Sequence, residues 1–461
     1  MSHDTPAELR QTLLLGEAFK AILSKTYGHL RAPEPIVTPT GIAHLDALLG
    51  GGIVSSGPVL FSSTPETGKS TFAFQFSSIF QKTYPNGLVV YLDIEASGNV
   101  ASSEFRVNRT EAFGIDMQRF KYEPIVLDVM QVFELIETLV SLKKQFEDKI
   151  GKEFHILIVW DSIASTPSSK VDTAENHNQV IGHKARQLSF CLEKYSPLLK
   201  FNRITFIGID QVRADMKIEG PYAQKESSVG TFKDIKSATN IYALMHNVQQ
   251  WVFLSKKKQI SLAEGIGIDG WYVDIHSEKN KLAPSKHSIT CVFDKNHGLD
   301  KFWSEYTFLE EVTPSEKKIF KDKTPPFPFM IKKSGNQIVL QVSNPDDASI
   351  NYKSQPMFRK NAKKMYDTSE EFRGWFDYAV QLSVYYRIVK GIFQHNIAAN
   401  ESPLGVPLDE EISAPLLDEY LPNEAMYETQ SAPVLPPTLT PSPLSSQSDD
   451  EEEGSYESVF V

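Results

Sequence analysis

The stretch PVLFSSTPETGKSTFAFQFSSIF, residues 58–80, carries the pattern from which the fold is predicted. It begins with an apolar run typical of a buried β-strand, passes through a loop containing Gly-Lys-Ser, and ends in an amphipathic segment typical of a helix. Phosphate-binding loops occur in this order, because the loop amides and the helix N-terminus both point toward the anion. The loop fits the pattern G-x-x-x-x-G-K-S/T, except that Ser63 occupies the first glycine position.

Similar apolar runs recur along the chain at LVVYLD (88–93), HILIVWD (155–161) and ITFIGID (204–210). Continuous apolar strands separated by helical segments are typical of a parallel sheet that is buried on both faces. Two later runs, GWYVDIH (270–276) and SITCVFD (288–294), are expected to extend that sheet with antiparallel strands. We therefore predict an α/β fold built on a twisted, mostly parallel sheet.

Polar residues stand where three of these strands end, which is where open α/β sheets bind their ligands. Phosphoryl transfer to water requires a carboxylate that holds magnesium, a group that orients the water and a sensor of the γ-phosphate. We assign these roles to Asp161, Glu95 and Gln211, although each residue taken singly is equally compatible with a helix cap or a solvated loop. Ser70 and Asp161 are the expected magnesium ligands, and the residues expected to bind ATP are Ser63, Thr64, Pro65, Glu66, Thr67, Gly68, Lys69, Ser70, Thr71 and Asp161.

The charge of the chain is unevenly distributed. Residues 401–461 contain fourteen acidic residues, no Lys or Arg and nine prolines, and removing their charge from the net −11 leaves +3 on residues 1–400. Such a segment cannot bury enough apolar surface to order itself, so we predict a disordered acidic tail. The two cysteines and the absence of a signal-like or membrane-spanning apolar run favour a soluble, cytoplasmic protein without a membrane partner.

Four regions are expected. Residues 1–36 form an N-terminal helix and a Pro-rich linker, residues 37–312 form the ATPase core, and residues 313–400 form a small basic domain that ends in a helix around residues 372–393. The boundary lies near the Lys-rich stretch KKIFKDKTPPFPF (317–329), and the tail follows from residue 401.

These motifs resemble the RecA recombinases, including their phage UvsX-type relatives, over about residues 37–300. TPTGIAHLDALLGGGI resembles the family's lead-in to the phosphate loop, YLDIEAS the strand with the catalytic glutamate, VWDSIAS its Walker B segment, and GIDQVRADMKI the strand whose glutamine couples ATP to DNA. The chain departs from the family pattern at Ser63, at Asp210, where Asn is usual, and at Trp160, which directly precedes the Walker B aspartate.

The late segment EKNKLAPSKHSITCVFD resembles the one in which two family lysines reach a neighbouring subunit's ATP. The resemblance implies that Lys279 and Lys281 act in this way, with Lys69, Glu95 and Gln211 as the other catalytic residues. It also implies a DNA-dependent ATPase that forms homo-oligomeric helical filaments on single-stranded DNA and exchanges strands with homologous duplex DNA in recombination and repair. Residues 1–36 would pack between subunits, and a single-strand-binding or mediator protein is a candidate partner of the acidic tail. A phage or bacterial cytoplasm fits this reading.

In that family, two loops bind DNA, and they correspond here to about residues 166–182 and 213–237. The second contains basic residues for phosphates and aromatic residues, among them Tyr222, for bases. An ordinary exposed loop is the alternative interpretation. The DNA-binding candidates are Lys184, Arg186, Arg213, Lys217, Lys225, Phe232, Lys233 and Lys236.

Two other functions share these motifs. A hexameric DnaB-type helicase uses the same fold and Walker residues, and closed rings or DNA unwinding would identify it. A non-hydrolysing filament scaffold or recombination mediator is favoured by Ser63 and would lack DNA-stimulated phosphate release. The late two-lysine segment favours the recombinase over both.

Overall fold

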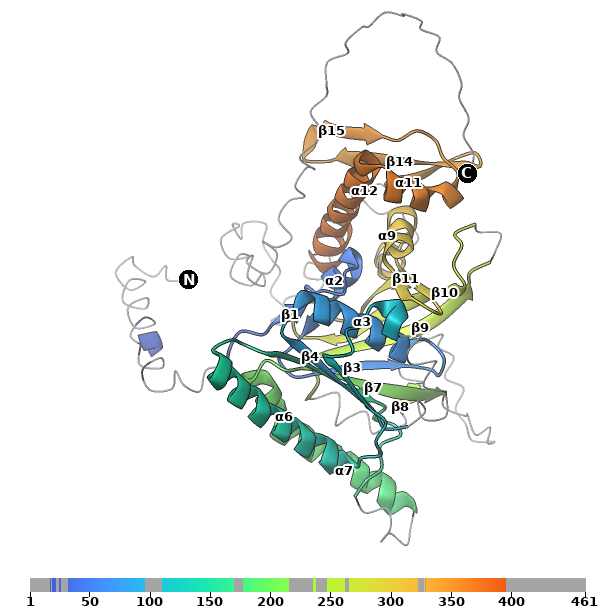
Figure 1. Cartoon of the computed structure of the whole chain (residues 1–461). Helices are drawn as coiled ribbons and strands as arrows, with labels where there is room; N and C mark the ends of the chain where they lie inside the picture. Colours follow the sequence, from blue (N-terminus) through green and yellow to red (C-terminus); the bar gives the residue numbers. More distant parts are fainter. Residues whose placement is uncertain are drawn as a thin grey trace, which may run out of the picture.

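The computed structural model describes residues 32–95, 110–169, 177–214, 235–237, 247–261, 265–321, 327 and 329–394, with Glu17, Phe19, Lys20, Ala21 and Lys25 near the N-terminus. Three features dominate it: a large central sheet, helices on both of its faces, and a smaller C-terminal sheet with its own helices (Figure 1).

The central sheet has the strand order β12-β11-β10-β9-β3-β7-β6-β4-β5, and β8 pairs with β7. Its members are β3 (Pro58–Ser63), β4 (Gly87–Asp93), β5 (Phe120–Glu123), β6 (His155–Asp161), β7 (Thr205–Ala214), β8 (Ile235–Ser237), β9 (Gln250–Gln259), β10 (Gly270–Asn280), β11 (His287–Asp294) and β12 (Gly298–Asp300). The six strands from β9 to β5 are parallel, and β10, β11 and β12 continue the sheet antiparallel. A separate antiparallel pair joins β1 (Val37–Thr38) and β2 (Ile53–Val54). The mostly parallel α/β fold is confirmed, together with its antiparallel extension.

The parallel strands are buried on both faces because alternate residues enter two different cores. On β3, Val59 and Phe61 join the cluster that contains Phe72 and Phe76 of α3 (Lys69–Thr83). Leu60, between them, joins the cluster formed with α6 (Val129–Ile150) and α7 (His177–Phe201). Figure 1 shows α6 and α7 along one side of the sheet and α3 on the other. This alternation is the physical reason why the strands read as continuous apolar runs.

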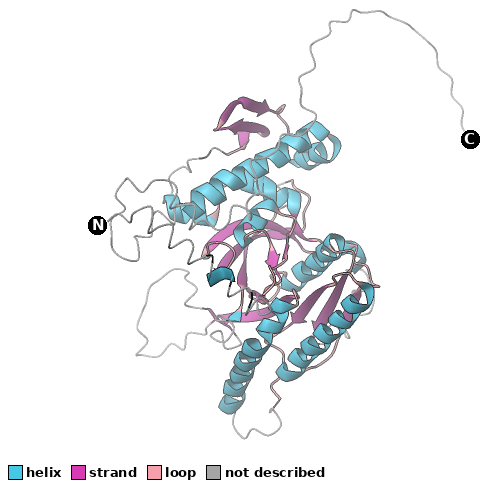
Figure 2. Ribbon diagram, turned by 90° about the vertical axis from the view of Figure 1, so that its left-hand side faces the viewer, coloured by secondary structure: helices cyan, strands magenta, loops and turns pink. Residues whose placement is uncertain are grey.

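The C-terminal part contains a three-stranded antiparallel sheet, which stands apart from the central sheet with helices between them (Figure 2). Its elements are β13 (Ile331–Ser334), β14 (Gln337–Asn344), β15 (Asp347–Lys353), η5 (Arg359–Asn361), α11 (Ala362–Thr368), α12 (Glu370–Ser383) and the π-helical η6 (Val384–Phe393). One apolar cluster joins these elements to α2 (Ala43–Leu49) and α9 (Lys301–Glu310). The division at residue 313 therefore crosses a shared core, and it stays a prediction.

A buried ion pair holds η6 against the helix α10 (Pro314–Phe320), which follows α9 in the chain. Arg387 on η6 donates from Nε and Nη2 to the two carboxylate oxygens of Glu316, at 2.8 and 2.7 Å. Both side chains are only 1% exposed, and the remaining Arg387 donors reach the carbonyls of Phe308 and Glu311. Glu316 also closes a capping box with Thr313 at the start of α10. Each nitrogen of the Arg387 guanidinium and each oxygen of the Glu316 carboxylate thus has a hydrogen-bond partner, as a buried charge requires.

Several expectations fall on residues that the structure does not describe. Most of the N-terminal helix, residues 170–176 and 215–234 of the two candidate DNA loops, and the whole acidic tail lie outside the described residues. Among the helices in the described ranges, none is both long and apolar enough to span a membrane.

We expect Arg387→Met to lower the free energy of unfolding by about 3–5 kcal/mol, because it leaves the Glu316 carboxylate buried without its partner. Urea denaturation measures the change. The matched control is Lys390→Met, because Lys390 lies on the same helix in a looser, exposed pair with Asp346 (3.9 Å) and should contribute less than about 1 kcal/mol. Equal effects of the two variants would contradict the role given to the buried pair.

Candidate nucleotide site

Backbone pairing of the parallel strands brings the predicted site residues to one edge of the sheet. Ser63 at the end of β3 pairs with Gln211 on β7. Asp161, which ends β6, pairs with Ile209 on β7 and with Asp93 on β4. The strand before the phosphate loop and the strands that carry Asp161 and Gln211 are therefore adjacent. Gln211 lies within β7, which continues to Ala214 and does not end before the glutamine as expected. The edge at which they end is the one expected to hold a ligand.

The phosphate loop follows directly from β3, and Lys69 begins α3. Gly68 has φ +105°, and a Cβ atom on it would lie 2.1 Å from Cζ of Phe293 on β11. Both the backbone conformation and this close approach exclude a side chain, so glycine is required at this position. The Phe293 ring thereby packs closely against the loop at Gly68.

Ser63 is accommodated by the lysine of the same loop. Its hydroxyl accepts a hydrogen bond from Lys69 Nζ at 2.7 Å and donates one to the Thr64 carbonyl at 2.7 Å. Ser63 is fully buried and lies within β3, where extended backbone does not require glycine. Lys69 Nζ also donates to the Ser63 and Thr64 carbonyls, at 3.3 and 3.1 Å. These oxygens hold the ammonium group of Lys69 within its own loop.

Burial lowers the pKa of Lys69 to about 8, and the negative charges of Asp161, Asp210 and Glu95 offset part of this effect. A lysine in such a position loses much of its own hydration before any ligand arrives. An anionic phosphate that replaces the carbonyl oxygens would restore charge compensation. The site is therefore suited electrostatically to an anion.

Asp161 is held by hydroxyl groups from two elements. Tyr91 OH on β4 donates to its Oδ2 at 2.6 Å, and the Ser70 hydroxyl also hydrogen-bonds to this carboxylate. Burial raises the pKa of Asp161, and these two hydrogen bonds act in the opposite direction. A carboxylate beside the hydroxyl that follows the P-loop lysine is the donor set that magnesium takes together with phosphate oxygens.

Glu95 and Gln211 meet at the same edge. Gln211 Nε2 donates to Glu95 Oε1 at 3.2 Å, and two serine hydroxyls, Ser162 Oγ and Ser165 Oγ, donate to the same oxygen at 2.9 and 2.6 Å. The Glu95 side chain is exposed, so its carboxylate is accessible to solvent water. The residues expected to orient the water and to sense the γ-phosphate are thus in direct contact.

Comparison with known proteins identifies a matching family and relatives of similar sequence. Residues 38–196 match the family described as "ATPase: KaiC". The RecA protein of Ureaplasma parvum is 28% identical over 282 residues, which cover 59% of this chain and 73% of that protein. The RecA protein of Syntrophus aciditrophicus is 28% identical over 55% of this chain and 64% of its own length. The chain contains a RecA-like ATPase domain.

The two late lysines of the RecA-like domain lie away from their own phosphate loop. Lys279 on β10 pairs with Trp251 on β9, which pairs with Leu60 near the start of β3. The backbone amide of Lys281 donates to the Gln249 carbonyl, and Gln249 N donates to the carbonyl of Pro58, the first residue of β3. Because the loop follows Ser63, the last residue of that strand, it is separated along the sheet by about 10 Å from the backbone of Lys279 and by about 17 Å from that of Lys281.

The DNA-binding candidates are only partly described. Lys184 is half-buried on α7, and its Nζ donates to the Ala164 carbonyl at 2.8 Å. Arg186, two residues later, is exposed. Arg213 and Lys236 occupy paired positions on β7 and β8. Four further candidates lie outside the described residues: Lys217, Lys225, Phe232 and Lys233.

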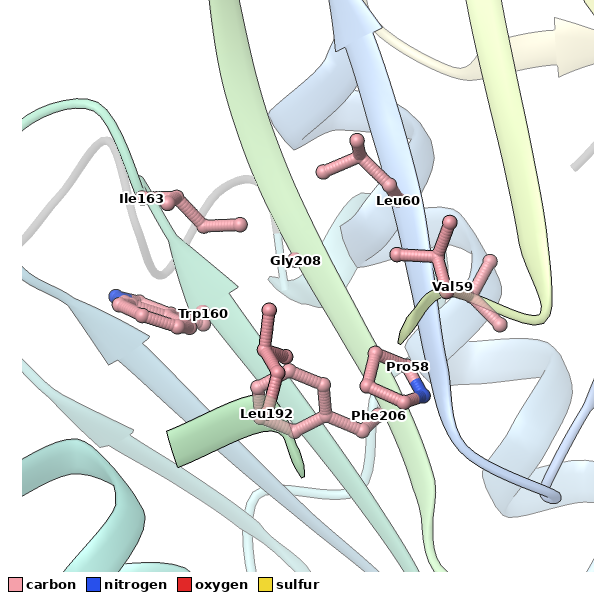
Figure 3. Close-up of a pocket in the computed structure, with 9 residues that line it drawn as sticks. Pro58, Val59, Leu60, Trp160, Ile163, Leu192, Phe206 and Gly208 are labelled. Carbon is pink, nitrogen blue, oxygen red and sulfur yellow. The ribbon is translucent and has the colours of Figure 1, made fainter. Parts of the chain in front are cut away.

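Trp160 and Asp210, the two other departures from the family pattern, lie in different surroundings: Trp160 is in the apolar core and Asp210 is near Lys69. The Trp160 ring is fully buried against Phe133, at 5.8 Å, and its Nε1 donates to Thr166 Oγ1 at 2.8 Å. It lines a small apolar cavity between the sheet and α7, together with Ile163, Phe206 and Leu192 (Figure 3). Trp160 therefore belongs to the core beneath the site. Asp210 is buried near Lys69, and its negative charge offsets part of the decrease that burial causes in the Lys69 pKa.

Sequence reasoning missed Tyr91, Phe293 and Ser165, which contact Asp161, Gly68 and Glu95 respectively. Tyr91 and Phe293 read simply as apolar strand residues. Ser165 stands four residues after Asp161 in VWDSIAS, so its proximity to the motif was the one available signal.

We expect the affinity for Mg-ATP to fall about tenfold between pH 7 and pH 9. Lys69 in the free protein is charged below its pKa of about 8 and neutral above it, so phosphate binding is strong at low pH and weakens as pH rises. Dissociation constants from equilibrium titration provide the test. Lys69→Arg is the control, because guanidinium stays charged throughout this range. The assignment fails if the wild-type constant is independent of pH or if the arginine variant shows the same slope.

Proposed function

We propose that this protein is an ATP-dependent DNA strand-exchange protein that forms helical filaments on single-stranded DNA. The observation that carries the proposal is the contact between Gln211 and Glu95. Gln211 lies directly before the candidate DNA segment 213–237, while Glu95 is the candidate water-orienting group. A single side chain thus connects the hydrolytic centre to the segment expected to contact DNA. The RecA name of the relatives supports the same function.

Hydrolysis is assigned to the residues at the strand ends. Lys69 would bind the β- and γ-phosphates, and Ser70 and Asp161 would hold magnesium, which when bound neutralises charge on the phosphate oxygens. Glu95 would orient the attacking water and accept its proton, since its carboxylate is exposed and fixed by neighbouring donors. Gln211 would exchange its hydrogen bond with Glu95 for one to the γ-phosphate.

That exchange provides the switch. Gln211 is part of β7, which continues to Ala214 and pairs with β8 through Arg213 and Lys236. Movement of Gln211 toward a γ-phosphate would shift the start of the DNA segment, as in other nucleotide-sensing segments. Basic residues at both ends of that segment supply phosphate contacts. ATP binding would therefore order the DNA segment, and hydrolysis would release it.

The function is tested by measuring phosphate release with and without single-stranded DNA. We expect DNA to stimulate turnover by at least about tenfold and ATP to produce helical filaments in electron micrographs, because both depend on the Gln211 switch. Strand exchange between a single strand and its homologous duplex completes the test. Lys69→Ala should abolish all three activities. Closed rings that unwind duplex DNA would indicate a helicase, and filaments without turnover would indicate a scaffold.

A second experiment tests whether Lys279 and Lys281 act on the ATP of a neighbouring subunit. Their separation from their own phosphate loop supports this arrangement. Positive charge supplied from a neighbour, as by an arginine finger, changes the rate by about 10³ to 10⁵. We expect Lys281→Ala to retain ATP binding and to lose DNA-stimulated hydrolysis by a factor approaching this range.

Mixing distinguishes action between subunits from action within one subunit. A Lys69→Ala subunit keeps its late lysines, so it should restore turnover at the intact phosphate loop of a Lys281→Ala neighbour. The control is each variant alone at the same total concentration. Absence of recovery at every ratio, with both variants shown to assemble together on DNA, would mean that the lysines do not act on a neighbour's ATP.

A further inference from the structure

The hydrogen bonds that hold Glu95 converge on one of its two carboxylate oxygens. Ser162 Oγ, Ser165 Oγ and Gln211 Nε2 all donate to Oε1. One carboxylate oxygen offers about two lone-pair sites, so Oε1 is saturated. Within the described part of the chain, every hydrogen bond to this carboxylate goes to Oε1. Oε2 is therefore the oxygen available to a water molecule. The two serines, by holding Oε1, determine the direction in which Oε2 points.

Ser165 makes the shortest of these three bonds, 2.6 Å, yet it is not a packing residue. Its side chain is exposed, whereas Ser162 is fully buried. The two serine hydroxyls also contact each other at 3.0 Å, and Ser162 Oγ accepts from the Ser165 amide at 3.3 Å. Glu95 is exposed as well, so this hydrogen bond adds little to the buried core, and its main effect is to orient the carboxylate.

The backbone around Ser165 is fastened by residues from outside its own turn. Lys184 Nζ, reaching from α7, donates to the carbonyl of the preceding residue, Ala164. On the other side, Thr166 Oγ1 donates to the Ser162 carbonyl at 2.8 Å and accepts from Trp160 Nε1. Burial lowers the pKa of Lys184, and the Asp210 carboxylate opposes this effect. Lys184 is thus placed to hold the turn that presents Ser165.

We propose that Ser165 is a positioning residue for hydrolysis, and that Lys184 supports it by holding Ala164. The proposal rests on the hydrolytic role of Glu95 in the proposed function. Ser165 anchors Oε1, which stops the carboxylate from rotating and leaves Oε2 directed at the attacking water. Orientation of a reacting group is worth most in the chemical step, so its loss lowers kcat and leaves nucleotide binding unchanged.

The experiment compares three variants of the full chain in steady-state phosphate release with saturating single-stranded DNA and without DNA. Ser165→Ala should lower kcat by about tenfold to a hundredfold, as expected for the loss of one hydrogen bond to a charged group, with KM for ATP unchanged. Ser165→Thr, which keeps the hydroxyl, should recover at least about half of the wild-type kcat. The matched control is Ser141→Ala, because Ser141 is an exposed serine on α6 that donates to the Glu137 carbonyl of its own helix.

A double-mutant cycle tests the part played by Lys184. Lys184→Met keeps the length of the side chain and removes the bond to Ala164, so kcat should fall by a similar factor. In the Ser165→Ala background the same substitution should have an effect of less than about twofold, because the group through which it acts is gone. Full additivity of the two changes would overturn the link between Lys184 and Ser165.

Several results would overturn the positioning role itself: an unchanged kcat for Ser165→Ala, a loss confined to KM, or an equal loss in Ser165→Thr. A wild-type chain that hydrolyses ATP without any response to DNA would overturn the proposed strand-exchange function and leave the Ser165 comparison valid, since that comparison also uses DNA-free turnover. A wild-type chain that releases no phosphate under either condition would overturn both.

Discussion

The parallel hydrogen-bond register of β3, β7, β6 and β4 is the constraint on which the nucleotide site depends. Each of these strands ends in a polar residue or leads directly into a polar loop, and the register decides which of these meet. A slip of one residue would turn every side chain of a strand to the opposite face. The two separate cores resist such a slip, because alternate residues of each strand are buried in different clusters. The apolar faces of the sheet therefore hold the polar edge in place.

The parts of this architecture that depend on repeating patterns could be predicted from sequence. Apolar runs indicated the central strands. The polar residues that follow these runs indicated that Asp161, Glu95 and Gln211 are neighbours. The antiparallel extension followed from the strand-like runs after residue 270. The strands could be predicted because burial on two faces leaves a continuous apolar run in each strand.

Contacts between side chains from different elements could not be predicted in this way. A side chain at position 68 would clash with the ring of Phe293, which lies more than two hundred residues later in the chain. Nothing in the sequence around either residue indicates this contact. Tyr91 reads as one more apolar strand residue until its hydroxyl is seen on Asp161. The buried Arg387–Glu316 pair is of the same kind, because both are ordinary surface residue types whose burial is visible only once the helices are packed. Ser63 shows the converse: a departure from the motif that looks damaging in sequence is matched by a bond to Lys69.

The phosphate loop follows the end of β3, whereas Lys281 lies level with its first residue. The two groups therefore lie toward opposite sides of the subunit, which gives the subunit a direction. If each pair of lysines acts at the phosphate loop of the next subunit, the interface between subunits is heterologous. Repeating such an interface gives an open filament, unless the rotation from one subunit to the next closes a ring. An open assembly then has one terminal subunit whose loop lacks a lysine donor and another whose lysines face no nucleotide. Its two ends are chemically unlike, so growth and loss of subunits need not occur at equal rates at both. Direction along the bound strand would then originate in the backbone pairing of a single sheet.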